Sequence, residues 1–448
     1  MSFIAQLAGK KCLVIGGGVT GTALKRALES FKAEVMVFDE SAKSGTVNQI
    51  PDKIELAITS PGWRKDHPIF TQLSKMGTQI LSEIDFAWMI KNELAPDQKW
   101  VALTGTNGKT TTIQMVESIF QKAKINGAAC GNVGETVIAA VCHQPAYEYL
   151  ALELSSFQID WSQLPKYESV AILNISPDHI DWHGSFDSYR AAKLKLLTQA
   201  KGVILNKTDS EIRNRCAMMQ NVIWFSLDTP APGEIGLVEE LLIDRAFSPN
   251  PNEANEICEL VDITPTVPHN VLNAMAAAAL SLSIGVSYQD IKSGLNSFTT
   301  DHHRMELVRK HNEINWIDDS KATNPHAAAA SIMANLNVVW LAGGLAKGAQ
   351  MDDLIKQCGS RIKHAILFGK DRDLIAQALK KFAPNVPIKF IDLKSDNKQL
   401  IRDVVAAAKE IAVAGDTVLL APACASMDQF SSYVERGQLF TQEVKALS

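Results

Sequence analysis

The sequence predicts an α/β protein of three domains, each built on a mainly parallel sheet. Short apolar runs of strand length alternate with helix-length segments along the whole chain, which is the pattern of βαβ units. Two glycine-rich turns, Gly16–Gly21 and Gly105–Gly108, each stand between an apolar run and a helical pattern. The length of 448 residues also exceeds what one hydrophobic core accommodates, because a domain typically has about 150 residues.

The first predicted domain covers residues 1–96 and is expected to be Rossmann-like. Its apolar runs and turns predict a strand at 11–15, a helix at 21–31, and strands at 34–39 and 54–59. The segment 92–99 is polar and contains a proline, so we expect a linker there.

The second predicted domain covers residues 97–298 and contains the second glycine-rich turn. Its pattern predicts strands at 100–104, 149–154, 170–175 and 203–205, and helices at 110–123 and 271–284, the latter beginning near Pro268–Asn270. The alternation favours a second sheet that is mainly parallel.

The third predicted domain, residues 299–448, has the most regular alternation and is expected to be Rossmann-like. Strands are predicted at 315–318, 338–342, 365–369, 388–391 and 417–421, separated by helix-length segments.

Composition limits the class of partner. Acidic side chains number 49 and basic ones 44, so the chain lacks the broad positive field that nucleic acid or an anionic membrane would select. No segment approaches the roughly 18 apolar residues of a membrane span, and no plausible signal cleavage site precedes the first glycine-rich turn. The seven cysteines are scattered without a C-x-x-C pair, which favours free thiols in a cytoplasmic protein.

The first glycine-rich turn fits the G-x-G-x-x-G fingerprint of dinucleotide-binding folds, and Asp39 lies 18 residues beyond its last glycine. Glycines there let the backbone approach a pyrophosphate at a helix N-terminus. The motif therefore predicts a bound nucleotide diphosphate. An NAD-dependent dehydrogenase is the obvious hypothesis, but a different phosphate loop begins at Gly105 where the second half of a dinucleotide fold would follow.

The second glycine-rich turn predicts an ATP site. Its backbone amides can wrap phosphates, Lys109 can reach the β and γ groups, and the Thr110 hydroxyl can bind Mg²⁺ at the start of a helix. Two residues, not four, separate Gly105 from Gly108, so the loop is a compact variant of the standard P-loop. The predicted ATP contacts in this loop are Gly105, Thr106, Asn107, Gly108, Lys109, Thr110 and Thr111.

Further polar residues lie in or after predicted strands of the second domain. The apolar run 149–154 carries Glu153, where burying an unpaired carboxylate would be costly, and Mg²⁺ would supply the missing charge. His179 and His183 have the i, i+4 spacing of some zinc sites, but Pro177 and Gly184 indicate a loop, and H-E-x-x-H is absent. Lys193 would by default be a lysine on a helix surface.

These motifs together resemble the ATP-dependent Mur ligases of peptidoglycan synthesis, which have folylpolyglutamate synthase as a relative. The resemblance covers essentially the whole chain. Its motifs are GTNGKTT, LELSSFQ, NISPDHIDWHG with the following Y-x-x-A-K, and PHNVLNAMAA, at 105–111, 152–158, 174–184 with 189–193, and 268–277. The third-domain segments 318–324, 343–347 and 423–430 are similar to those of the members that add D-glutamate.

The resemblance implies an ATP-dependent ligase that adds D-glutamate to UDP-N-acetylmuramoyl-L-alanine through an acyl phosphate. It implies that the first domain holds UDP and not NAD. The UDP-sugar contacts implied in this way are Val19, Thr20, Asp39, Ser60, Gly62 and Asn132. Further ATP contacts implied are Asn270, Asn273, Arg304 and Asp319, and the residues implied on the D-glutamate side are Lys321, Thr323, Lys347 and Ser426.

The resemblance also implies two Mg²⁺ sites and a catalytic set of Lys109, Glu153, His179 and Lys193. Thr110 and Glu153 would hold the first ion and His179 the second. Lys193 would be carbamylated by CO₂, which converts an ammonium that cannot bind a metal into a carboxylate-like ligand.

Three alternatives stay open: an NAD-dependent dehydrogenase, a P-loop protein that hydrolyses ATP to drive a partner, and a sister ligase specific for another amino acid or for folate. Because one chain carries every residue that the ligase mechanism requires, a monomer is expected.

Overall fold

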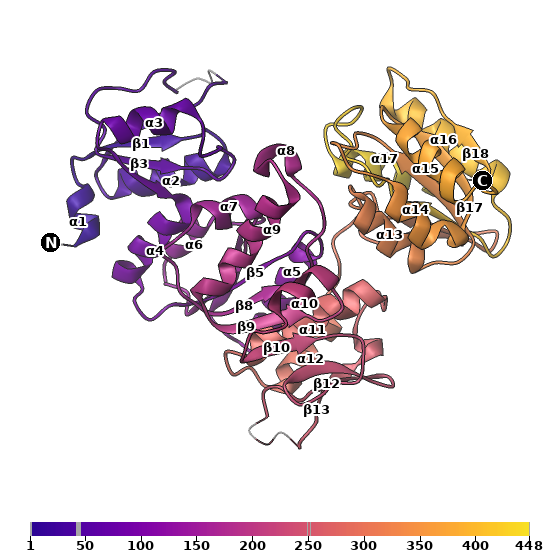
Figure 1. Cartoon of the computed structure of the whole chain (residues 1–448), viewed down its shortest axis with the longest axis horizontal. Coiled ribbons are helices and arrows are strands. Elements are labelled where there is room, and N and C mark those ends of the chain that lie inside the picture. Colours follow the sequence, from indigo (N-terminus) through magenta and orange to yellow (C-terminus); the bar gives the residue numbers. More distant parts are fainter. Residues whose placement is uncertain (1, 42–45, 249, 251, 448) are drawn as a thin grey trace. The chain divides into compact units, whose positions relative to one another are not determined.

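The computed structural model describes residues 2–41, 46–248, 250 and 252–447. The chain forms three sheets, in which parallel pairing dominates, so the predicted α/β class is confirmed (Figure 1). It clusters into two compact units: Met1–Ile175 with Trp182–Thr266 and Asn270–Phe298, and Ser176–Asp181 with Val267–His269 and Thr299–Ser448. Among the described helices, none has both the length and the apolar character that crossing a membrane requires.

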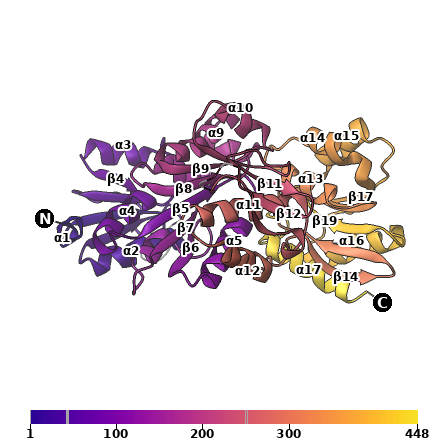
Figure 2. The ribbon, with the colours of Figure 1, turned by 90° about the horizontal axis from the view of Figure 1, so that it is seen from below.

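The first unit opens with a four-stranded parallel sheet of order β2-β1-β3-β4, with α2 and α3 on opposite faces (Figures 1 and 2). The linker predicted at 92–99 begins too early, because residues 92–94 are the last residues of α4, whose N-terminus is capped by Ser82. The elements are β1 (Lys11–Ile15), β2 (Glu34–Phe38), β3 (Leu56–Thr59), β4 (Gln79–Ser82), α1 (Phe3–Leu7), α2 (Val19–Ser30), α3 (Pro68–Lys75) and α4 (Glu83–Leu94).

The same unit contains a nine-stranded sheet of order β13-β12-β11-β10-β9-β8-β5-β7-β6. In this order, every neighbouring pair between β6 and β11 is parallel, whereas β12 pairs antiparallel with both β11 and β13. Its strands are β5 (Lys99–Thr104), β6 (Gly127–Gly131), β7 (Tyr149–Glu153), β8 (Tyr167–Ile172), β9 (Ala200–Asn206), β10 (Val222–Phe225), β11 (Glu234–Val238), β12 (Leu241–Asp244) and β13 (Asn255–Glu259).

Both faces of this sheet are buried. Trp100 and Ala102 of β5 face one hydrophobic cluster and Val101 and Leu103 face the other, as expected for a parallel strand covered on both sides. Figure 2 shows α9 and α10 on one side of the sheet and α5 and α12 on the other. The helices that follow β5 are α5 (Lys109–Lys122), α6 (Val137–Val141), α7 (Ser156–Trp161), α8 (Ile180–His183), α9 (Phe186–Leu194), α10 (Ser210–Cys216), α11 (Pro268–Leu282) and α12 (Tyr288–Ser297).

The two sheets of the first unit share a core. One buried cluster contains Val14 and Ile58 from the four-stranded sheet together with Ala102 and Leu152 from the nine-stranded sheet. The division of this unit into 1–96 and 97–298 stays a prediction.

Two buried acids in the first turn of α4 hold the segment around β7. Asp85 Oδ1 accepts the backbone N–H groups of Gln163 and Leu164, each at 2.8 Å, and so satisfies donors just beyond α7. Glu83 Oε1 accepts the backbone N–H of Ile138 at 3.2 Å, in the first turn of α6. Burial raises the pKa of the Glu83 carboxyl to about 7.

The second unit is built on a six-stranded sheet of order β14-β15-β19-β16-β17-β18, which is parallel except for the edge pair β14 and β15. Its elements are β14 (Glu306–His311), β15 (Ile314–Asp318), β16 (Val338–Gly343), β17 (Ile362–Phe368), β18 (Ile388–Phe390), β19 (Thr417–Leu420), α13 (Pro325–Met333), α14 (Asp352–Cys358), α15 (Arg372–Phe382), α16 (Asn397–Ile411) and α17 (Tyr433–Lys445).

Candidate active site

The predicted phosphate loop connects β5 to α5. Lys109 is the first helical residue, so the backbone N–H groups of the first turn of α5 face the loop without partners inside the helix. Gly108 has φ +82°, which a side chain tolerates poorly, and a Cβ there would lie 2.4 Å from Oδ1 of Asn273. The structure therefore brings Asn273, a predicted ATP contact on α11, against the loop.

Two side chains outside the glycine motif fix the shape of this loop. Nδ2 of Asn174 donates to Asn107 O at 3.0 Å, and its Oδ1 accepts the Asn107 N–H at 2.8 Å. Lys109 Nζ donates to Gly105 O at 2.9 Å and to Thr106 O at 3.1 Å. The conformation of the loop is thus fixed by hydrogen bonds from its own lysine and from Asn174, which follows β8. The sequence did not indicate this role for Asn174.

Glu153, the last residue of β7, is 1% exposed. Its Oε1 accepts Nδ2 of Asn132 at 3.0 Å, whereas Oε2 is buried and has no hydrogen-bond partner among the described residues. A buried carboxylate oxygen with no donor is costly unless a cation neutralises it. Carboxylate and hydroxyl oxygens are hard ligands that suit Mg²⁺, so Glu153 and the predicted partner Thr110 fit this ion by chemistry.

Lys193 is a buried residue of α9 and not a surface lysine, since it is only 1% exposed. Nζ donates to Gly105 O at 2.8 Å and to Thr104 Oγ1 at 3.1 Å, and it lies 4.9 Å from the ring centroid of Tyr189. The Tyr189 hydroxyl in turn pairs with Thr106 Oγ1 at 2.9 Å. α9 therefore places a cation directly against the phosphate loop.

The two histidines that follow β8 have separate surroundings. His179 has φ +50°, and its Nε2 lies 3.7 Å from Oδ2 of Asp178. The ring of His183 stacks on Phe157, and its Nε2 pairs with Ser156 Oγ at 2.9 Å. His183 thus packs α8 on α7. This packing role agrees with the prediction that His179 and His183 do not form a zinc site.

At the edge of the first sheet, the loops that follow β1, β2 and β3 meet. Asp39 Oδ2 accepts the Gly17 N–H at 2.7 Å, and Ser60 Oγ donates to Ile15 O at 2.7 Å. A Cβ on Gly16 would lie 2.1 Å from Ser60 Oγ, so glycine is required for this close approach. Val19 and Thr20 begin α2 beside this loop, and Val19 is 78% exposed.

On α11, the predicted ATP contacts Asn270 and Asn273 are both buried. Nδ2 of Asn270 donates to Pro265 O at 2.9 Å, so its amide fixes the approach to the helix.

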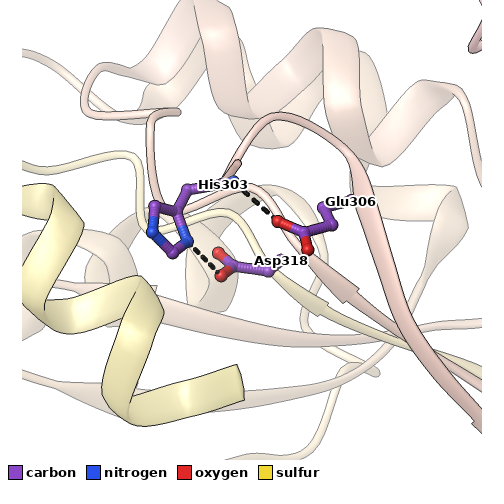
Figure 3. Close-up of side chains that lie close together, drawn as sticks. All are labelled: His303, Glu306 and Asp318. Carbon is purple, nitrogen blue, oxygen red and sulfur yellow. Dashed lines mark hydrogen bonds and ion pairs between the residues drawn. The ribbon is translucent and has the colours of Figure 1, made fainter. Parts of the chain in front are cut away.

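In the second unit, His303, Glu306 and Asp318 lie close together (Figure 3). His303 Nδ1 and Asp318 Oδ2 are 2.6 Å apart, and Glu306 Oε2 accepts the backbone N–H of His303 at 3.0 Å. The hydrogen bond that His303 donates to the Asp318 carboxylate raises the pKa of His303. The hydrogen bond between the His303 ring and Asp318, together with the one from the His303 backbone to Glu306, accounts for the proximity of these three side chains without a metal.

The two other predicted ATP contacts of this unit are Arg304 and Asp319. Arg304 Nε lies 3.9 Å from Oδ2 of Asp301. Asp319 is buried, and its carboxylate accepts the Met305 N–H and the Ser331 hydroxyl. Burial raises the pKa of Asp319 to about 6.

The loops that carry the predicted D-glutamate contacts converge beyond β15, β16 and β19. The Ala423 N–H donates to Ala322 O at 2.9 Å, and Leu345 and Ala425 exchange two backbone hydrogen bonds. The predicted contacts on these loops are Lys321, Thr323, Lys347 and Ser426. Lys321 Nζ lies 4.1 Å from the ring centroid of Tyr433. Lys347 is exposed and has φ +50°, whereas Ser426 is buried.

A buried arginine that the sequence analysis did not single out holds two of these loops. Arg436 is fully buried on α17 and donates to Ser320 O at 2.8 Å, Ser320 Oγ at 3.0 Å and Cys424 O at 3.3 Å. Burial lowers the pKa of Arg436 to about 10. One planar guanidinium thus fixes the loop after β15 to the loop after β19.

Comparison with known families defines the class of protein. Residues 103–281 match the Mur ligase middle domain, and residues 303–424 match the Mur ligase glutamate ligase domain. The chain belongs to the Mur ligase family.

Full-length relatives define the branch of the family that this chain resembles. The chain is 42% identical to the UDP-N-acetylmuramoylalanine–D-glutamate ligase of Thermobifida fusca, over 99% of this chain and 100% of that protein. It is 40% identical to the protein of the same name from Streptomyces coelicolor, over 99% of each chain.

Solved structures show the same fold at low identity. A pseudomurein peptide ligase type C from Methanothermus fervidus superposes with a TM-score of 0.61 at 18% identity, covering 97% of this chain and 100% of that one. A MurF ligase from Thermotoga maritima in complex with ADP gives a TM-score of 0.58 at 16% identity, covering 99% and 97%.

Proposed function

We propose that this protein is the ATP-dependent ligase that joins D-glutamate to UDP-N-acetylmuramoyl-L-alanine in peptidoglycan precursor synthesis. The observation that carries the proposal is the match over essentially the whole length to D-glutamate ligases at 42% and 40% identity. The phosphate loop after β5, with Lys109 at the start of α5 and Glu153 at the end of the neighbouring strand β7, would supply the ATP chemistry that such a ligase needs.

The reaction needs activation because a carboxylate does not condense with an amine in water. The L-alanine carboxylate attacks the γ-phosphorus of ATP and expels ADP, which gives an acyl phosphate. The amine of D-glutamate then attacks the acyl carbon and loses a proton, and inorganic phosphate leaves with both electrons of the broken C–O bond. The products are an amide, ADP and phosphate.

The phosphate loop would position the γ-phosphoryl group for this attack. Backbone amides at the start of α5 and the Lys109 ammonium would bind the β and γ phosphates. Lys109 Nζ now bonds to two loop carbonyls, so it would exchange these for phosphate oxygens when ATP binds. Thr110 and Glu153 would hold Mg²⁺, which would supply positive charge to the transferring group.

We further propose a second Mg²⁺ site that includes His179 and a carbamylated Lys193. The support for this proposal is the family resemblance of the 174–193 run and the burial of Lys193 beside Gly105. Mass spectrometry of gently handled protein tests the carbamate: an added CO₂ on Lys193 supports the proposal, and full activity without it contradicts the role.

The remaining contacts are assigned by the same resemblance. Asn270, Asn273, Arg304 and Asp319 would contact ATP; Val19, Thr20, Asp39, Ser60, Gly62 and Asn132 would contact the UDP-sugar; and Lys321, Thr323, Lys347 and Ser426 would contact D-glutamate. The lysines suit a substrate with two carboxylates.

A three-domain division at 1–96, 97–298 and 299–448, a monomeric state and a cytoplasmic location belong to this proposal as well. The monomeric state is supported by the presence of all proposed site residues in one chain.

Phosphate release measured across a panel of amino acids tests the proposal. With ATP, Mg²⁺ and UDP-N-acetylmuramoyl-L-alanine, we expect release only when D-glutamate is added. Release with L-alanine, a diamino acid or a dipeptide would identify a sister ligase, and release without any amino acid would favour a P-loop ATPase. Binding of NADH in an absorbance titration would favour the dehydrogenase.

A further inference from the structure

The turn after β3 carries two proposed UDP-sugar contacts, Ser60 and Gly62. It is tied to the first glycine-rich loop, because the Ser60 N–H and Oγ both donate to Ile15 O, at 2.9 and 2.7 Å. Any shift of this turn therefore also moves the edge at which a diphosphate would bind.

Two tryptophans from the segments that flank β8 also bind this turn. Nε1 of Trp182 on α8 donates to Gly62 O at 3.0 Å, and Nε1 of Trp161 on α7 donates to Trp63 O at 2.8 Å. In a trans peptide the carbonyl and the next N–H point in opposite directions. Each indole therefore fixes the plane of one peptide in the turn and the direction of the N–H that follows it.

The two indoles are themselves held by neighbouring groups. The ring of Trp182 packs on Phe157 with centroids 4.7 Å apart, and the ring of Trp161 packs on Phe70 at 4.8 Å. Lys65, two residues after Trp63, donates to Asp160 O at 2.7 Å and pairs with Asp160 Oδ2 at 2.8 Å. Rigid rings held in this way can position a turn with little loss of conformational entropy.

We infer that Trp161 and Trp182 are positioning residues for the UDP-sugar, acting through the 60–63 turn. This inference rests on the proposed function, since it takes the 60–63 turn as part of the UDP-sugar site. Trp161 lies eight residues after the proposed catalytic residue Glu153, on the helix that follows β7. The hydrogen bond from Trp161 therefore connects the nucleotide-sugar turn to the segment that follows a proposed Mg²⁺ ligand.

Trp161→Phe and Trp182→Phe test this inference, because phenylalanine keeps an aromatic ring and removes the N–H donor. We expect each variant to raise the KM for UDP-N-acetylmuramoyl-L-alanine by about 5-fold, which corresponds to about 1 kcal/mol. The KM for ATP and the kcat should change by less than about 2-fold, and the unfolding midpoint should stay close to that of the parent protein.

Trp88→Phe is the matched control. Trp88 is a half-buried tryptophan on α4 that packs on Trp100, away from the turn, so its variant should leave the KM for the UDP-sugar unchanged. An unchanged KM for the UDP-sugar in both test variants would overturn the inference, and so would an equal rise in the KM for ATP, which would indicate general loosening.

Calorimetric titration with UDP separates this inference from the proposed function. If the parent protein binds UDP and both variants bind it more weakly, the inference is supported. If all three bind UDP equally, the positioning role is wrong although the UDP site stands. If the parent protein neither binds UDP nor turns over the UDP-sugar, the proposed function fails and the inference falls with it.

Discussion

Glu83→Gln should change how the stability of the first unit depends on pH. Glu83 lies at the start of α4, is 2% exposed, and accepts the Ile138 N–H through Oε1. Glutamine has nearly the same shape and keeps one acceptor oxygen, but it does not titrate. The variant therefore removes the titration of one buried carboxyl with little change in packing.

The magnitude follows from the shift in the pKa of Glu83, from 4.5 to about 7. At 1.36 kcal/mol per pKa unit, the shift corresponds to about 3 kcal/mol. Because the folded protein retains a proton that the unfolded chain releases, this contribution to stability is fully present below about pH 4.5 and is lost as the pH rises through about 7. Between about pH 5.5 and about pH 8 the loss amounts to about 2 kcal/mol.

Urea unfolding of both proteins at these two pH values measures the effect. From about pH 5.5 to about pH 8, the free energy of unfolding of the parent protein should fall by about 2 kcal/mol relative to that of Glu83→Gln. Glu34→Gln, which changes an exposed carboxyl on β2, serves as the control and should not reproduce the change. A difference between parent and Glu83→Gln that stays constant across this pH range would refute the reasoning.

Three further predictions concern the site. Glu153→Gln should lower kcat by about 100-fold or more without lowering the unfolding midpoint, because the substitution removes a buried charge that needs Mg²⁺; activity and thermal melts check this, and retained turnover would contradict the metal role. Gly108→Ala should cost about 1–2 kcal/mol of stability and raise the KM for ATP, since a Cβ would meet Asn273 at a positive φ; Gly9→Ala, with a positive φ but open space, is the control, and equal ATP kinetics in both variants would argue against the clash. Lys347→Ala should raise the KM for D-glutamate by about 10-fold with little effect on the KM for ATP, and unaltered D-glutamate kinetics would show that the assignment is wrong.

The strands that the sequence predicted best are those buried on both faces. Cys12–Ile15 of β1 and residues 338–342 of β16 are continuous apolar runs, and the predicted ranges 11–15 and 338–342 agree with the observed strands to within one residue. β6 was missed because its sequence is mostly glycine and alanine, and β14 because its residues are only partly buried. Helix α2 begins at Val19, two residues before the predicted start, because the glycine loop leads directly into its first turn.

Site residues in local motifs can be predicted from the sequence, whereas residues that act through long-range contacts cannot. Gly105–Gly108 form the turn that leads into α5, and this turn with the following Lys-Thr pair predicts a phosphate loop from the sequence. Asn174 and Arg436 are brought to their loops only by the fold, across 67 and 116 residues of sequence. An arginine on an amphipathic helix such as α17 carries no sequence signal that distinguishes it from a surface residue.

In the proposed reaction, ATP phosphorylates the carboxylate of the UDP-linked L-alanine before D-glutamate attacks. Labelling both oxygens of that carboxylate with ¹⁸O tests this order, with mass spectrometry of the phosphate and of the sugar peptide after turnover with D-glutamate. We expect each phosphate to carry one ¹⁸O and the new amide to retain the other. Unlabelled phosphate formed together with the amide product would contradict it.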